Sequence, residues 1–133
     1  MADSSDPARA FADALHALED SGDLDAMTAR FADDAEVHAL PSRRDHEGKG
    51  GVRDFWQEYL DQFDRVHSDF SRVETVGGSR GILEWTATGQ LKGGHDITYD
   101  GVSLLDLNDD GLVTRFRTYY DSAAFVQVKA DTK

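Results

Sequence analysis

The sequence contains no cysteine, only two prolines and no long hydrophobic run. Without cysteine the chain has no disulfide, so we expect an intracellular, cytoplasmic protein. No apolar stretch approaches the ~18 residues that a membrane-spanning helix needs. The opening MADSSDPARA also lacks the apolar core of a signal peptide. We therefore expect no membrane segment.

Basic side chains are also few. Fourteen lysines and arginines stand against 26 aspartates and glutamates, which gives a formal net charge of −12. The densest basic group, Arg43, Arg44 and Lys49, is interrupted by Asp45 and Glu47. Nucleic acids and anionic membranes attract proteins with a basic footprint. The charge pattern therefore argues against both as partners.

What the sequence does contain is sufficient for one globular domain. It has 133 residues, 39% of them hydrophobic, and a chain of this size buries roughly two thirds of its unfolded surface. We expect a single domain over residues 1–133, with residues 1–5 and about 127–133 as loose tails.

Three helical patterns occupy the first half of the sequence. The first begins at Asp6–Pro7, a typical N-cap and first-turn pair, and is predicted to run to about residue 20. The second follows Asp23 and is predicted to end near residues 33–34, before an extended piece at 35–40. After a polar loop at 41–51, a third helix is predicted from an apolar stripe at helical spacing: Val52, Phe55, Trp56, Tyr59, Leu60 and Phe63.

The second half of the sequence has the period of β-strands. Strand-like runs cover residues 66–76, 82–91, 97–107 and 112–120, and short glycine-containing turns separate them. Short connections make neighbouring strands antiparallel. Helices followed by strands are typical of an α+β domain with helices on one face of the sheet.

The last strand-like run continues to a carboxylate at Asp121. On a period of two, Arg117, Tyr119 and Asp121 share one face of the strand. This face is suited to the polar wall of a cavity, and it is equally typical of an edge strand with a surface ion pair. The spacing leaves both interpretations open.

Four segments resemble a known superfamily and together cover most of the chain. They are GDLDAMTARFADDAEVH (22–38), GGVRDFW (50–56), ILEWTATG (82–89) and GVSLLDLNDDGLVTRFRTYYD (101–121). In these segments the sequence resembles the nuclear transport factor 2-like superfamily, and within it the SnoaL-like group named for polyketide cyclases. The resemblance implies a cone-shaped α+β fold, with three N-terminal helices packed on a curved, mostly antiparallel sheet around an apolar pocket.

The resemblance also implies a chemistry. SnoaL-like cyclases close a ring by an intramolecular aldol step without metal or organic cofactor, using an aspartate near the end of the last strand. Asp121 matches that position, and Tyr119 and Arg117 are the expected supporting residues. The resemblance to epoxide hydrolases of the limonene epoxide hydrolase type gives an alternative, in which Arg117 and Asp121 combine with Asp96 or Asp100 to activate water.

The steroid isomerase branch shares the segment around residues 22–37. Its three functional positions fall on Leu15, Ala39 and Ser103 here. A leucine, an alanine and a serine do not replace a tyrosine and two aspartates in that chemistry, so we expect no steroid isomerase activity.

Six residues are expected to line the pocket: Phe55, Trp56, Tyr59, His38, Trp85 and Ser103. For His38 a position at the rim is favoured, because Val37 and Ala39 would point into the core by alternation. None of the five histidines has HxH, HxxxH or HExxH spacing, so we expect neither a metal nor another cofactor.

These observations predict cofactor-free acid/base chemistry of the cyclase, isomerase or hydrolase type on a small hydrophobic carbonyl or epoxide compound. The alternative is a non-catalytic module for ligand binding or dimerisation. We also expect a homodimer through the sheet, because Leu105, Leu107, Phe116 and Tyr120 are more apolar side chains than one face readily covers.

Overall fold

A computed structural model describes residues 6–41 and 43–125. The tails predicted at residues 1–5 and about 127–133 lie outside this part. The elements are α1 (Pro7–Ser21), α2 (Leu24–Thr28), β1 (Phe31–Ala39), β2 (Arg44–Glu47), α3 (Gly48–Asp61), β3 (Phe63–Val76), β4 (Arg80–Leu91), β5 (Asp96–Leu107) and β6 (Val113–Tyr120). The predicted α+β fold is confirmed.

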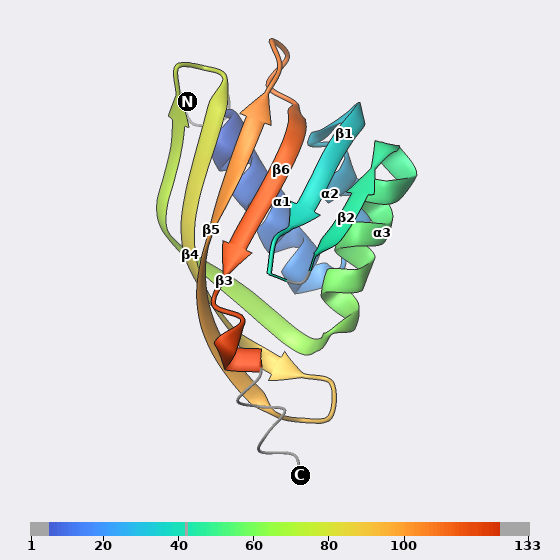
Figure 1. Cartoon of the computed structure of the whole chain (residues 1–133), viewed down its shortest axis with the longest axis vertical. Helices are drawn as coiled ribbons and strands as arrows, with labels where there is room; N and C mark the ends of the chain where they lie inside the picture. The colour runs from blue at the N-terminus through green and yellow to red at the C-terminus, as the bar shows by residue number, and fades with distance from the viewer. Residues whose placement is uncertain (1–5, 42, 126–133) are drawn as a thin grey trace.

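The six strands form one sheet in the order β2-β1-β6-β5-β4-β3. All neighbouring strands are antiparallel except β1 and β6, which are parallel. The sheet curves strongly and the helices cover one of its faces, as Figure 1 shows. No helix in the described part is long and apolar enough to cross a membrane.

The first helix follows the sequence prediction closely. The carboxylate of Asp6 accepts hydrogen bonds from the backbone N–H groups of Ala8 and Arg9, and Gly22 ends the helix in the left-handed conformation. The second helix is shorter than predicted, because it ends at Thr28 and β1 already begins at Phe31. Pairing of Phe31 with Val113 of β6 prevails over the local helical spacing.

The polar loop predicted at 41–51 is also wrong in part. Residues 44–47 form β2, which pairs with β1 at the sheet edge, and α3 begins at Gly48. The strand β2 alternates between half-buried and exposed polar side chains, so it gives no apolar pattern. Phe63, predicted at the end of the third helix, instead opens β3.

The core lies between the helices and the inner face of the sheet. Its centre is a group of aromatic rings that pack mainly edge-to-face: Phe11, Phe31, Phe55, Trp56 and Phe116. The four apolar residues that were expected to exceed what one face of the sheet can cover all belong to its inner face. Leu105, Leu107 and Phe116 are buried in the core, and Tyr120 packs against it.

Candidate functional site

A cavity of about 50 Å³ lies between the helices and the inner face of the sheet. Almost every element contributes to it, because α3 and the strands turn their core-facing side chains toward the same space. The lining residues are Leu15, Arg44, Phe55, Trp56, Tyr59, Gln62, Ser68, Trp85, Tyr99, Ser103, Phe116, Thr118, Tyr120 and Phe125.

Eight of these residues are aromatic, and the described residues that line the cavity include no carboxylate and no imidazole. The polar groups are hydroxyls, two indoles, one amide and the guanidinium of Arg44. The cavity is therefore a largely apolar space with several neutral hydrogen-bonding groups. Ligand pockets commonly have this composition.

The indole of Trp56 carries an unused donor. Trp56 is only 3% exposed, and its Nε1 is buried without a hydrogen-bond partner in the described part of the chain. Buried indole N–H groups usually have an acceptor, since an unpaired one costs about 1–3 kcal/mol. This donor belongs to a residue of the cavity wall.

A second indole is held by a chain of hydroxyls. Trp85 Nε1 donates to Ser103 Oγ at 3.0 Å, and Ser103 Oγ lies 3.0 Å from Thr118 Oγ1. Gly101 leaves room for the Trp85 ring, because a Cβ at that position would come within 2.3 Å of it. This side of the cavity is thus fixed by hydrogen bonds and close packing.

Glu19 of α1 lies behind the opposite wall. Its Oε2 accepts from Tyr59 Oη at 2.8 Å and from Ser68 Oγ at 2.6 Å, and its Oε1 accepts from the Ser68 backbone N–H at 2.8 Å. Burial, followed by the nearby Glu19 charge, raises the pKa of Tyr59 well above its usual value of 10. Burial likewise raises the pKa of Tyr99. Both phenols stay neutral at ordinary pH.

The charge of Arg44 is balanced at the cavity edge. Its Nη1 donates to Glu58 Oε1 at 3.0 Å, and its guanidinium lies 4.6 Å from the centre of the Phe55 ring. Burial raises the pKa of Glu58, but hydrogen bonds from His46 and Arg44 outweigh it and the net shift is downward. Arg44 is therefore held by Glu58, which does not line the cavity, and by the ring of Phe55 in the cavity wall.

Phe125 also lines the cavity. Its ring lies 4.8 Å from that of Tyr99 and 5.7 Å from that of Tyr120, measured between centroids. It belongs to a helical turn that follows β6. Figure 1 shows this turn in red, below the tip of the β6 arrow. The turn begins at Asp121, whose Oδ1 accepts from the Ala123 N–H at 3.0 Å.

The predicted catalytic group therefore lies elsewhere than expected. Asp121 is exposed and caps this turn, Tyr119 is 39% exposed, and none of Asp121, Tyr119 and Arg117 is among the residues that line the cavity. The inner side chains of β6 are Phe116, Thr118 and Tyr120. Since strand side chains alternate between faces, the predicted polar face points away from the cavity.

The six predicted pocket residues divide in two groups. Phe55, Trp56, Tyr59, Trp85 and Ser103 line the cavity. His38 does not, because it alternates with the buried Val37 and Ala39 and belongs to the outer face of the sheet. There its Nδ1 lies 2.6 Å from Asp45 Oδ1 and its Nε2 lies 3.1 Å from Glu36 Oε1.

The aspartates of the epoxide hydrolase alternative are also outside the cavity. Asp100 is exposed and accepts a hydrogen bond from Thr86 Oγ1, and Asp96 is exposed with Arg65 Nη2 3.9 Å away. Neither forms a described contact with Arg117. Of the steroid isomerase positions, Leu15 and Ser103 line the cavity, whereas Ala39 is fully buried.

Sequence reasoning missed the polar groups that do reach this region. Glu19 lies four residues after Leu15 on the apolar stripe of α1, which is the signal that marks it. Ser68, Tyr99 and Thr118 occupy inward positions on their strands. Each of these residues is a single polar side chain on an otherwise apolar strand face. The sequence spacing therefore does not predict that they lie close together.

The sequence of residues 8–116 matches the SnoaL-like domain family. This chain belongs to the SnoaL-like domain family. A search of curated protein sequences finds no significant match. The family assignment therefore rests on the match to the domain, which spans most of the chain.

Solved structures share the fold. A putative isomerase from Rhodopseudomonas palustris is 15% identical, with a TM-score of 0.80 and coverage of 94% of this chain and 96% of that one. A putative SnoaL-like polyketide cyclase from Jannaschia sp. is 20% identical (TM-score 0.74, 92% of each chain). A protein from Catenulispora acidiphila with a ketosteroid isomerase-like fold, in complex with trimethylamine, is 16% identical (TM-score 0.76, 86% and 87%). These identities show a common fold and nothing more specific.

Proposed function

We propose that this SnoaL-like protein binds a small, largely apolar molecule that carries a hydrogen-bond acceptor, such as a carbonyl or an epoxide oxygen. The observation that carries the proposal is the unpaired indole N–H of Trp56 in the wall of an aromatic cavity. An acceptor placed there would satisfy this donor, and the surrounding rings would cover the rest of the molecule.

The direction of the other hydrogen bonds supports a neutral ligand. Tyr59 and Ser68 donate their hydroxyl protons to Glu19, so these protons are not available to the cavity. Trp85 donates to Ser103 in the same way. Of the two indoles in the cavity wall, only Trp56 thus keeps a free N–H, and a single acceptor on the ligand matches it.

Two structural neighbours support the proposal of a small-molecule function. The Catenulispora acidiphila protein is solved with trimethylamine, and the Jannaschia neighbour is described as a putative polyketide cyclase. Cyclisation and isomerisation act on carbonyl compounds of the class proposed for this cavity. The space in the cavity is about 50 Å³, which suits a small ligand.

The experiment is a ¹H–¹⁵N NMR titration, in which the two indole N–H groups of Trp56 and Trp85 give separate signals. The probes are cyclopentanone and cyclopentene oxide, with cyclopentane as a control that lacks an acceptor. We expect both acceptor-bearing probes to shift the Trp56 signal downfield while the Trp85 signal moves less. Trp56→Phe assigns the signal and should weaken binding about fivefold or more, as expected for one lost hydrogen bond. An equal response to cyclopentane would refute the acceptor site.

Acid/base turnover is the second candidate, and one observation favours it. Glu19 is within hydrogen-bond distance of two cavity hydroxyls, those of Tyr59 and Ser68, and a carboxylate in such a position can accept a proton through them. If the protein turns over cyclopentanone, cyclopentene oxide or a larger ketone, Glu19→Gln should reduce kcat by roughly 10²–10⁴-fold. Deuterium exchange of the α-hydrogens of cyclopentanone measures this step directly.

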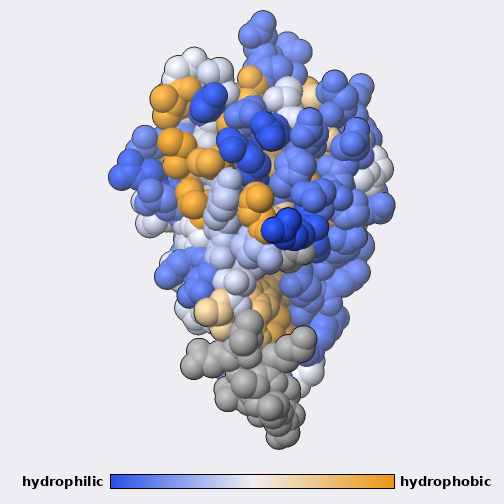
Figure 2. Space-filling view, in the orientation of Figure 1, coloured by the Kyte–Doolittle hydropathy of each residue, from blue (hydrophilic) through white to orange (hydrophobic). Residues whose placement is uncertain are grey.

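We further propose a homodimer formed through the outer face of the sheet. The apolar side chains there are Ile82, Val102 and Leu104, which are half-buried, and the more exposed Tyr119. Figure 2 shows apolar patches among hydrophilic groups on this face. Arginines and carboxylates surround the patches, including Arg72 with Glu84 and Arg80 with Asp106. A two-fold axis can place opposite charges of the two copies together.

A further inference from the structure

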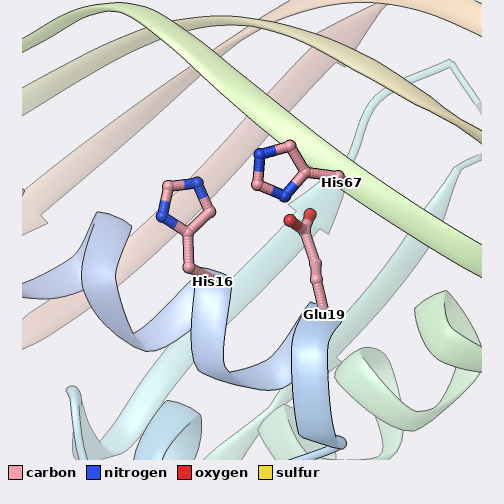
Figure 3. Close-up of side chains that lie close together, drawn as sticks. All are labelled: His16, Glu19 and His67. Atoms are coloured by element: carbon pink, nitrogen blue, oxygen red, sulfur yellow. The ribbon is translucent and has the colours of Figure 1, made fainter.

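Three side chains with metal-binding groups meet outside the cavity, between α1 and β3. His16 and Glu19 are one turn apart on α1, and His67 projects from β3 toward them, as Figure 3 shows. One ligand atom from each of the three lies within 4.8 Å of the other two. The two imidazole rings stack nearly parallel with 5.0 Å between their centroids.

Two imidazoles and one carboxylate are a donor set that suits zinc. Catalytic and open zinc sites use three such protein ligands and complete a tetrahedral geometry with water. The side chain of His67 is 51% exposed, so water can reach the fourth position. Thiolate ligands are absent, because the sequence has no cysteine.

The surroundings hold the ligands in the way that metal sites require. Three donors fix the Glu19 carboxylate: the Ser68 backbone N–H, the Ser68 hydroxyl and the Tyr59 hydroxyl. His67 Nε2 lies 3.3 Å from Asp69 Oδ1, and in Figure 3 a ring nitrogen of His67 faces the Glu19 carboxylate. Outer partners of this kind orient metal ligands and raise their basicity.

Binding requires a small adjustment. His16 Nε2 is 2.8 Å from the carbonyl oxygen of Ser68, and this contact is exchanged for the metal. Ligand atoms around tetrahedral zinc lie about 3.3 Å apart, so the three groups close in from separations of up to 4.8 Å. The exposed position of His67 allows this movement, which lowers the affinity below that of a preformed site.

We propose that His16, Glu19 and His67 form a binding site for a divalent transition-metal ion of the zinc type, completed by water. The site is separate from the ligand cavity but connected to it, because Glu19 Oε2 accepts a hydrogen bond from Tyr59, a residue of the cavity wall. A metal bound to Glu19 thus lies close to that hydroxyl, whatever ligand the cavity takes.

The test uses the full chain after treatment with a chelator. Zn²⁺ is titrated by calorimetry in the presence of excess Mg²⁺, which occupies sites made of carboxylates alone but competes poorly for imidazole. We expect one Zn²⁺ per chain. The visible spectrum of Co²⁺ in the same site should show the intense bands of four-coordinate geometry. The ring signals of His16 and His67 should shift in NMR spectra, and those of His95 should not.

Variants identify the ligands. His67→Ala removes an exposed ligand without loss of core packing and should weaken Zn²⁺ binding at least about tenfold. Glu19→Gln should do the same, with thermal unfolding measured beside it because Glu19 also binds Ser68 and Tyr59. His38→Ala is the matched control, since His38 also lies between two carboxylates but on the outer face of the sheet.

The proposal is overturned if Zn²⁺ does not bind in excess Mg²⁺, or if His67→Ala binds it as tightly as the unaltered protein. It is equally overturned if His38→Ala, and not His67→Ala, abolishes binding. Should Glu19→Gln fail to fold, the comparison of His67→Ala with His38→Ala still decides the outcome.

Discussion

Glu19 connects three elements through two oxygen atoms. It belongs to α1, and it accepts hydrogen bonds from Ser68 of β3 and Tyr59 of α3. Replacing Glu19 by alanine would leave these donors unpaired in a half-buried place. Each donor that water cannot reach would then lower the free energy of unfolding by about 1–3 kcal/mol. A single carboxylate thus orients a wall of the cavity and contributes to stability at the same time.

The exposed position of Asp121 leads to a prediction at this scale. Asp121→Asn keeps an oxygen that can accept from the Ala123 N–H, so the turn should persist. Because Asp121 does not line the cavity, we expect the affinity for cyclopentanone to change less than about twofold, in contrast to Trp56→Phe. The measurement is the same NMR titration. If Asp121→Asn loses binding while its fold is intact, Asp121 contributes to the ligand site and this prediction is wrong.

His38 gives a prediction for pH. Burial lowers the pKa of His38, but hydrogen bonds and charge interactions with Asp45 and Glu36 outweigh it, so the pKa is raised above 6.5. A raised folded-state pKa adds stability that is complete below about 6.5 and is lost as the pH rises through the folded-state value. The nearby Arg115, whose Nε is 4.0 Å from Glu36 Oε1, reduces the effect.

The measurement compares urea unfolding of the unaltered protein and His38→Gln between about pH 5.5 and 8.5. The difference in unfolding free energy should be largest at the acidic end and shrink toward the alkaline end. Because Asp45 and Glu36 are well exposed, solvent screening keeps the difference at about 1 kcal/mol or less. A difference that grows with rising pH would contradict the sign.

At the scale of elements, the turn after β6 contributes Phe125 to the cavity wall. Phe125→Ala removes the ring that packs on Tyr99 and Tyr120. We expect a larger ketone, cyclooctanone, to gain affinity by about tenfold relative to cyclopentanone, since the added space is apolar. Tyr119→Ala, on the outer face of the adjoining strand, is the matched control and should leave the ratio unchanged. Equal ratios in all three proteins would exclude a role for Phe125.

Elements with a strong apolar pattern were predictable, and those formed by pairing were not. The apolar stripe of α3 that contains Phe55, Trp56 and Tyr59 correctly predicted one wall of the cavity, because its helical spacing is unambiguous. The edge strand β2 has no apolar side chain, so its existence depends on β1. The core face of β6 was misjudged because both faces of this strand mix apolar and polar side chains, so alternation did not show which face turns inward.

The whole molecule is predicted to be a dimer. Static light scattering at micromolar concentration should give twice the chain mass of 14.7 kDa, or about 29 kDa. Leu104→Glu places a charge among Ile82, Arg117 and the other outer side chains that flank Leu104 across the sheet. It should therefore yield the monomer without unfolding it. A mass near 14.7 kDa for the unaltered protein would exclude the dimer at that concentration.

The parallel pairing of β1 with β6 has a consequence for folding. It joins residues near 37 to residues near 116, and a contact across so long a stretch of chain forms slowly because a large loop must close first. During synthesis, β1 and β2 leave the ribosome long before their partner exists. The hairpin made of β1 and β2 therefore has an unpaired strand edge until β6 has been synthesised. Unpaired edges of this kind promote aggregation. The slowest step of folding is expected to be the insertion of β6 between β1 and β5.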